Sequence, residues 1–167
     1  MGLLNQDNRY RMKQGLLTIR ERYWIEDQHG QRVFSVTGKL LRVRETLIFA
    51  NAEGQELYKI QEKLMNVRKT MAIESASGHT AATVHKALIS PLGSKWHIDI
   101  AGGHNWVAQG DLLAHEYIIQ RGLDVVAEVS KRWFRLTDTY GVDVKPGEDA
   151  ALALAVTVVI DALATKD

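Results

Sequence analysis

Residues 148–163 read EDAALALAVTVVIDAL, and between Ala150 and Ile160 the only polar side chain is that of Thr157. A helix over this stretch has no polar face to turn toward water, so the protein must bury it on all sides. The β-branched run at its centre is also compatible with a buried strand, but the alternating alanines and leucines before it favour a helix. The stretch from Ala150 to Leu163 spans about 21 Å as a helix, against the ~30 Å core of a bilayer. We therefore predict a helix enclosed by the protein itself.

The two ends of this helix carry candidate residues. Pro146 and Gly147 interrupt the preceding segment, and Glu148 or Asp149 can accept hydrogen bonds from the first free amides. Asp161 lies near the C-terminal end, where the helix dipole disfavours a negative charge. Either it marks the point at which the helix reaches water, or it is buried just inside, where a cation or loop amides set the depth of insertion. Asp149 and Asp161 are therefore our candidates for helix cap and register.

The composition fits one domain over residues 1–167, because 46% of the 167 residues are hydrophobic and can form a substantial core. Lys and Arg number 21 against 20 for Asp and Glu, so we expect no general affinity for nucleic acid. The chain has no cysteine, which excludes disulfides and thiolate chemistry. Residues 1–10 lack the apolar core of a signal peptide, and we expect a cytoplasmic protein without a transmembrane segment.

Between Arg9 and Lys145 the chain alternates in polarity over short segments, which glycine, asparagine, aspartate and serine separate about every dozen residues. Gly30, Gly54 and Gly78 recur at intervals of 24 residues, each between two apolar runs, and Gly122 ends a similar fourth unit. This pattern is typical of β-hairpins. Twelve strands are predicted, over residues 9–14, 22–27, 31–37, 43–50, 55–62, 68–75, 79–86, 94–101, 104–110, 115–120, 124–132 and 138–145.

Each predicted strand has one apolar face that needs a partner. The side chains expected to face inward are Tyr10, Met12, Val43, Leu47, Phe49, Trp96, Ile98, Ile100, Val125, Ala127, Val129, Tyr140, Val142 and Val144. Those expected to face water are Arg9, Arg11, Lys13, Lys95, His97, Asp99, Asp143 and Lys145. A sheet of twelve strands removes its edges by closing, and a barrel of that width needs something to fill it. We therefore predict a mainly β fold: a twelve-stranded closed antiparallel β-barrel around the central hydrophobic C-terminal α-helix.

Several segments, in this order along the chain, resemble one family. They are residues 57–64, 107–112, 126–133, 138–144 and 158–161. Through them the chain resembles the LURP-one-related proteins of the tubby C-terminal-like superfamily, which also includes tubby-like proteins and phospholipid scramblases. The resemblance implies the same barrel around a central helix, over nearly the whole chain. Tubby-like members bind phosphoinositide headgroups, and scramblases are associated with lipid movement and with calcium. For the LURP-one-related branch the resemblance implies no particular chemistry.

The polar residues do not form a pattern typical of catalysis or metal binding. The segment similar to the scramblase calcium region offers four scattered carboxylates, where calcium needs six to eight oxygen ligands; they are Asp138, Asp143, Glu148 and Asp149. The six histidines include no pair with metal spacing on a helix. Ser94, His97 and Asp99 match a triad by residue type only, since no nucleophile elbow surrounds Ser94. We expect no catalytic residue, no metal and no cofactor.

Basic residues form two groups. Lys59, Lys63, Arg68 and Lys69 bracket Met65 and Asn66 and are our candidates for binding a lipid headgroup, since a phosphate needs converging cations. The other group lies in the N-terminal strands and comprises Arg9, Arg11, Lys13, Arg20 and Arg22. Acidic neighbours at positions 21, 45, 56 and 62 indicate scattered charge instead. The preferred function is a non-enzymatic scaffold that binds a protein partner, and the alternative is binding of a phosphoinositide or another anionic lipid at a membrane surface.

Overall fold

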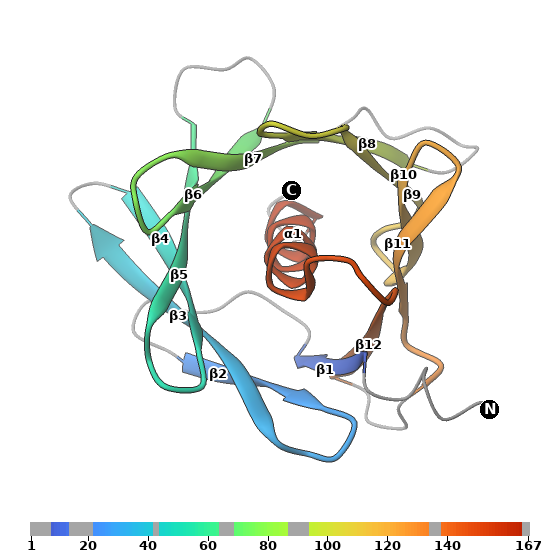
Figure 1. The fold of residues 1–167 in the computed structure, drawn as a ribbon, viewed down its shortest axis with the longest axis horizontal. Helices are drawn as coiled ribbons and strands as arrows, with labels where there is room; N and C mark the ends of the chain where they lie inside the picture. The colour runs from blue at the N-terminus through green and yellow to red at the C-terminus, as the bar shows by residue number, and fades with distance from the viewer. Residues whose placement is uncertain are drawn as a thin grey trace.

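The computed structural model describes residues 8–13, 22–41, 44–63, 69–86, 94–133 and 138–164. Within them lie twelve strands and one helix (Figure 1). The strands are β1 (Arg9–Lys13), β2 (Arg22–Asp27), β3 (Arg32–Leu41), β4 (Arg44–Asn51), β5 (Glu56–Glu62), β6 (Thr70–Ser75), β7 (Thr80–His85), β8 (Ser94–Ile100), β9 (Trp106–Asp111), β10 (Glu116–Arg121), β11 (Asp124–Ser130) and β12 (Thr139–Val144), and the helix is α1 (Ala150–Ala164).

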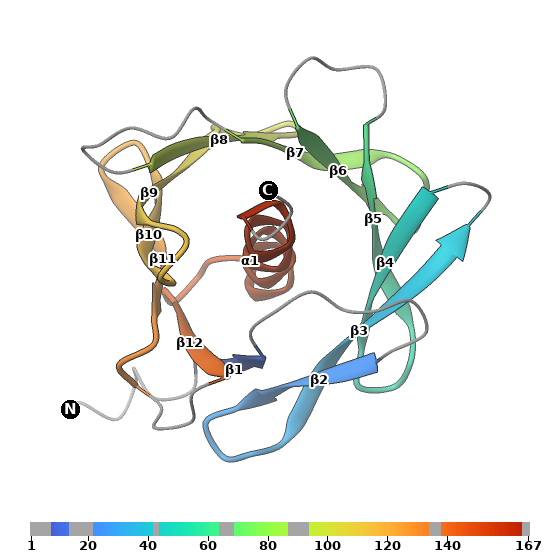
Figure 2. The same ribbon diagram turned by 180° about the vertical axis from the view of Figure 1, so that it is seen from behind.

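The strands form a closed antiparallel barrel in which each strand pairs with its neighbours in the chain. β1 pairs with β12 along its whole length, from Arg9 opposite Asp143 to Lys13 opposite Thr139, and this ladder completes the ring. Figures 1 and 2 show α1 running through the centre of the ring. The predicted fold is confirmed, including the helix that fills the barrel.

Hairpin tips gather at the mouth of the barrel where α1 begins, because every even-numbered strand ends there. Gly30, Gly54 and Gly78 close three of these tips with φ of 77°, 84° and 86°, a region that L side chains rarely adopt. In each, the glycine amide donates to the carbonyl three residues earlier, at 3.0, 3.0 and 2.9 Å. Gly102 lies 24 residues after Gly78 and has a φ of 68°, so it belongs to the same series, although the predicted repeat did not include it.

The predicted strand boundaries are close to those observed, with one clear error at β3. This strand continues to Leu41, although the prediction ended it at residue 37. The prediction left Gly38 and Lys39 outside the strand, and glycine and lysine are depleted in strands. These residues instead pair with β4, with Gly38 opposite Leu47 and Lys39 opposite Thr46, because a long ladder compensates for a weak local preference.

The core lies between α1 and the inner face of the barrel. Every residue of α1 from Leu152 to Ala164 is buried, and Met12, Phe49, Ile98, Tyr140 and Val142 are fully enclosed opposite it. Four side chains predicted to face inward are only partly buried, namely Tyr10, Leu47, Ile100 and Val125, and Val43 lies outside the described residues. In β11 a bulge shifts the ladder so that Val126 is buried as well as Ala127. Among the described residues no helix has the length and apolar character needed to cross a membrane.

Candidate functional site

The inside of the barrel is filled by α1, so a ligand has to be sought first on the outer wall and at the two mouths. β2, β3 and β4 lie side by side, and alternate residues of each face outward. Tyr23, Trp24 and Ile25 are three consecutive apolar residues in β2. Because neighbours on a strand point to opposite faces, Trp24 lies on the outer wall while Tyr23 and Ile25 belong to the core.

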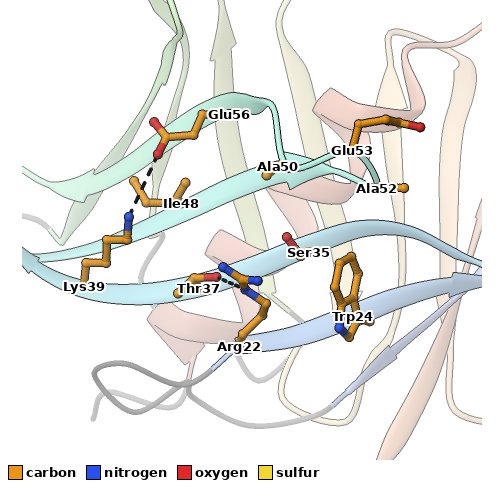
Figure 3. A pocket seen from close by; sticks show the side chains of 11 residues that line it. Arg22, Trp24, Ser35, Thr37, Lys39, Ile48, Ala50, Ala52, Glu53 and Glu56 are labelled. Atoms are coloured by element: carbon orange, nitrogen blue, oxygen red, sulfur yellow. Dashed lines mark hydrogen bonds and ion pairs between the residues drawn. The ribbon is translucent and has the colours of Figure 1, made fainter.

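A hollow of about 240 Å³ lies on this outer wall, beside Trp24 (Figure 3). Its floor is formed by three buried residues of β3 and β4, Ser35, Ile48 and Ala50. Its sides carry charges from β2, β3 and the β4–β5 hairpin, namely Arg22, Lys39, Glu53 and Glu56. The hollow therefore combines a small apolar floor with charged groups of both signs.

The charged groups of this hollow are weakly engaged. The Nε of Arg22 donates a hydrogen bond to Oγ1 of Thr37 at 3.0 Å. The Nζ of Lys39 lies 4.0 Å from a carboxylate oxygen of Glu56, and both side chains are about half exposed, at 48% and 58%. Such exposed pairs contribute little to stability, so both cations can turn toward a ligand at small cost.

A second hollow, of about 380 Å³, adjoins the first and shares Trp24 with it. It lies between β1 and β2 and reaches the start of β12. The guanidinium of Arg32 lies over the indole ring of Trp24, 5.1 Å from its centroid. Arg11 forms an ion pair with Glu26 across the two strands. We call the outer wall around both hollows the Trp24 surface; its charged residues are Arg11, Lys13, Arg22, Arg32, Lys39, Glu26, Glu53, Glu56 and Asp138.

The candidate lipid-binding residues are only partly brought together. Lys59 lies midway along β5, half-buried and opposite Glu74 of β6. Lys63 follows β5 and is exposed, and its amide donates to the carbonyl of Thr70 at the start of β6. Lys69 directly precedes that strand, so Lys63 and Lys69 share the mouth at which α1 ends, whereas Lys59 does not. Arg68 lies outside the described residues.

The two helix-end candidates are both engaged. A carboxylate oxygen of Asp149 accepts a hydrogen bond from the amide of Leu152 at 3.1 Å, which is the geometry of an N-terminal cap. Asp161 is 6% exposed and accepts from His115 Nε2 at 2.8 Å. His115 belongs to the β9–β10 turn, has a φ of 56°, and is stacked on Tyr140 with ring centroids 4.3 Å apart.

Three tyrosines surround this buried pair. Burial, and then the negative charge of Asp161, raise the pKa of Tyr23, Tyr117 and Tyr140 above the ordinary value. These hydroxyls are therefore neutral hydrogen-bonding groups and not nucleophiles. No local pattern in the sequence indicates the contact between His115 and Asp161, because 46 residues separate them.

The residue combinations tested for chemistry do not assemble. Ser94 lies on the opposite face of β8 from His97 and Asp99, as expected for odd and even positions of a strand. Asp99 instead contacts His85 of β7, at 2.8 Å. The four carboxylates of the calcium-like segment are dispersed, with Asp143 beside Arg9 and Lys145, Glu148 paired with Arg121, Asp149 capping α1 and Asp138 exposed. The described residues contain no group of three or more acidic or histidine side chains able to hold a metal ion.

The chain is similar to a known family and to individual known proteins. A family model described as LURP-one-related matches residues 8–161. An uncharacterized protein of Bacillus subtilis (strain 168), YxjI, is 31% identical over 68 residues, which are 41% of this chain and 42% of that protein. The aligned region is thus less than half of either chain. A solved structure of an Arabidopsis thaliana protein is similar with a TM-score of 0.41 and 14% identity, over 71% of this chain and 84% of that one.

Proposed function

The chain belongs to the LURP-one-related family, as its resemblance to that family implied, and we propose a function for it. In this proposal the chain is a non-enzymatic domain that binds a protein partner on the Trp24 surface. The proposal that it is not an enzyme is supported by the dispersal of its serine, histidine and carboxylate side chains. The pair formed by His115 and Asp161 is buried between the barrel wall and α1, where a substrate would not reach it.

The observation that carries the proposal is the position of Trp24 between the two hollows. Tryptophan and arginine dominate the binding energy of protein interfaces, and here Arg22 and Arg32 lie on either side of the indole. The nine charged residues around it comprise five cations and four carboxylates. A surface of mixed charge favours a protein partner over an anionic membrane or a nucleic acid, which need a converging positive field.

This proposal is tested with linear peptides selected from a random displayed library on the full chain. We expect Trp24→Ala to weaken their binding by at least about tenfold, measured by calorimetry, since an anchoring aromatic contributes 2 kcal/mol or more. Trp133→Ala is the matched control, because Trp133 is also a half-buried tryptophan beneath an arginine, with Arg9 4.2 Å from its ring. Equal losses in both variants, or no selected peptide at all, would overturn the proposal.

A second candidate is binding of anionic lipid headgroups at the mouth where α1 ends. It is favoured by the shared position of Lys63 and Lys69 at that mouth. It is weakened by Lys59, which lies away from them on the wall opposite Glu74. The second candidate thus rests on two of the four predicted lysine and arginine residues.

Sedimentation with phosphatidylcholine vesicles tests the second candidate, with and without a phosphoinositide and at two salt concentrations. Lys63→Glu should remove binding that depends on the phosphoinositide and on low salt. Lys95→Glu serves as the control, because Lys95 is an exposed lysine on the wall of β8. If the wild-type chain stays in solution with both kinds of vesicle at low salt, the lipid candidate is excluded.

A further inference from the structure

The barrel has a weak line between β1 and β2. These strands share only two residue pairs, Tyr10 with Asp27 and Arg11 with Glu26. The ladder stops there, although β1 continues to Lys13 and β2 extends back to Arg22. Every other ladder of the described barrel joins at least four pairs, and that between β3 and β4 joins eight. We call this line the β1–β2 seam, comprising residues 11–13 and 22–26.

The larger of the two hollows lies in this seam. Met12 and Tyr23, which belong to the inner face of the barrel, line it together with Lys13 and Trp24, which alternate with them onto the outer face. Met12 itself is fully enclosed, so the hollow is a gap between the two strands that opens on the outer face of the wall. Among the described residues, neither Met12–Lys13 nor the stretch 22–25 has a ladder partner on its seam side.

A gap of this form fits an extended peptide better than a helix or a small molecule. A strand edge that lacks a neighbour offers backbone donors and acceptors to an added strand, and the pockets beside it select alternate side chains. Side chains of such a strand that point toward the barrel would lie beside Tyr23, which is partly exposed and favours apolar groups. Outward side chains would lie beside Lys13 and Trp24.

The charges beside the seam indicate what those outward side chains are. Lys13, Arg22 and Arg32 are exposed, and none of them has a carboxylate within ion-pair distance in the part of the chain that the structure describes. Arg11 differs, because it already forms an ion pair with Glu26. The residues lining the hollow comprise three cations, Arg11, Lys13 and Arg32, and two carboxylates, Glu26 and Asp138, so their net charge is positive by one.

We propose that the partner inserts an extended acidic segment as an additional strand in the β1–β2 seam, with apolar side chains facing inward and carboxylates facing Lys13, Arg22 and Arg32. The proposal rests on the proposed function, because Trp24 belongs to both. It defines the chemistry of the partner: a linear sequence in which acidic and apolar residues alternate.

Hydrogen exchange of the free protein is the first test. Backbone amides of residues 12–13 and 22–25 that face the seam should exchange at least about tenfold faster than those of the β3–β4 ladder, because no described strand pairs with them. Slow exchange of all these amides would show that the seam is closed, and would overturn the proposal. On binding of a selected peptide the same amides should become protected.

Peptide variants and one protein variant provide the second test. Among the peptides selected with the full chain, N-methylation at alternate backbone positions should weaken binding by about threefold to tenfold at each hydrogen-bonded position and leave the intervening positions unaffected. Lys13→Glu should weaken binding of the acidic peptides by about tenfold, whereas Lys95→Glu should leave it unchanged. Peptides that need Trp24 but tolerate N-methylation and Lys13→Glu would overturn strand insertion and leave the proposed function standing. Peptides that do not need Trp24 would overturn both.

Discussion

At the scale of single residues, the buried contact between His115 and Asp161 is constrained both by the backbone of His115 and by the stacking of its ring on Tyr140. A φ of 56° is uncommon for a residue other than glycine. At His115 this backbone conformation directs the ring toward the carboxylate of Asp161 on α1. His115 Nδ1 and the hydroxyl of Tyr140 are buried and have no hydrogen-bond partner among the described residues, which is the usual setting of an internal water. Asp161 therefore links α1 to a turn of the barrel at one depth, since a buried carboxylate has few places in which it is satisfied.

Asp161→Asn tests that role. The substitution keeps the shape of the side chain and removes its charge, and we expect it to lower the free energy of unfolding by more than about 1.5 kcal/mol, in the range of a charged hydrogen bond. Urea denaturation measures the loss. In a double-mutant cycle with His115→Gln, the two losses should not add, because both variants break the same contact. A neutral or stabilising Asp161→Asn would show that the carboxylate does not hold the helix in register.

Glu148 gives a prediction about pH. Hydrogen bonds of 2.7 and 2.8 Å from Arg121 hold the pKa of Glu148 below its ordinary value of 4.5. A carboxyl whose pKa is lowered by folding contributes stability above the unfolded pKa and loses it as the pH falls through the folded pKa. Glu148→Gln should thus be less stable than wild type at neutral pH, and the difference should shrink below about pH 4.5 in thermal scans. Glu53→Gln, at an exposed hairpin tip, is the control variant in the same scans.

At the scale of elements, α1 behaves as part of the core and the hairpins as the scaffold around it. The residues of α1 from Leu152 onward are buried on every side of the helix, so this part of α1 has no solvent-exposed face. Both of its ends are tied to the barrel, by the Asp149 cap and Glu148 at the start and by Lys86, whose Nζ donates to the carbonyl of Leu163 at 3.2 Å, at the end. A detachable helix would not be fastened in this way.

Val158→Asp is the corresponding prediction. Val158 is 4% exposed, and an unpaired charge at that position costs several kcal/mol out of a total stability of about 5 to 15. We expect the variant to be insoluble or unfolded by circular dichroism. Val158→Ala, which leaves a small cavity without a charge, should remain folded with reduced stability. A soluble Val158→Asp protein with cooperative unfolding would contradict the assignment of α1 to the core.

At the scale of the whole molecule, barrel and helix depend on each other. A ring of twelve strands is too wide to be filled by its own side chains, and α1 is too apolar to be stable in water. The ladder between β1 and β12 joins the first and last strands of the described chain, so the helix follows a closed wall in the sequence.

Deletion of residues 148–167 tests this mutual dependence. Removing α1 exposes the inner face of the barrel, including Phe49, Ile98 and Val142, and we expect aggregates on size-exclusion chromatography. Deletion of residues 1–7, which precede the described strands, is the control and should give a soluble protein. A monodisperse barrel without residues 148–167 would show that the wall is stable alone.

The sequence by itself determined the elements and the architecture, because both follow from local periodicity. Alternating polarity and the glycines at intervals of 24 residues predicted the strands, and a helix without a polar face required a closed structure around it. Trp24 was not predicted as a site residue, although three consecutive apolar residues on a strand cannot all face the core. The tertiary structure alone decided which distant residues meet: the partner of Asp161, the separation of Lys59 from Lys63, and the short ladder between β1 and β2. The physical reason is that the register of the barrel and the depth of α1 depend on packing across the whole ring. Many apolar side chains fit almost equally well at each position, so only the complete set of contacts selects one arrangement.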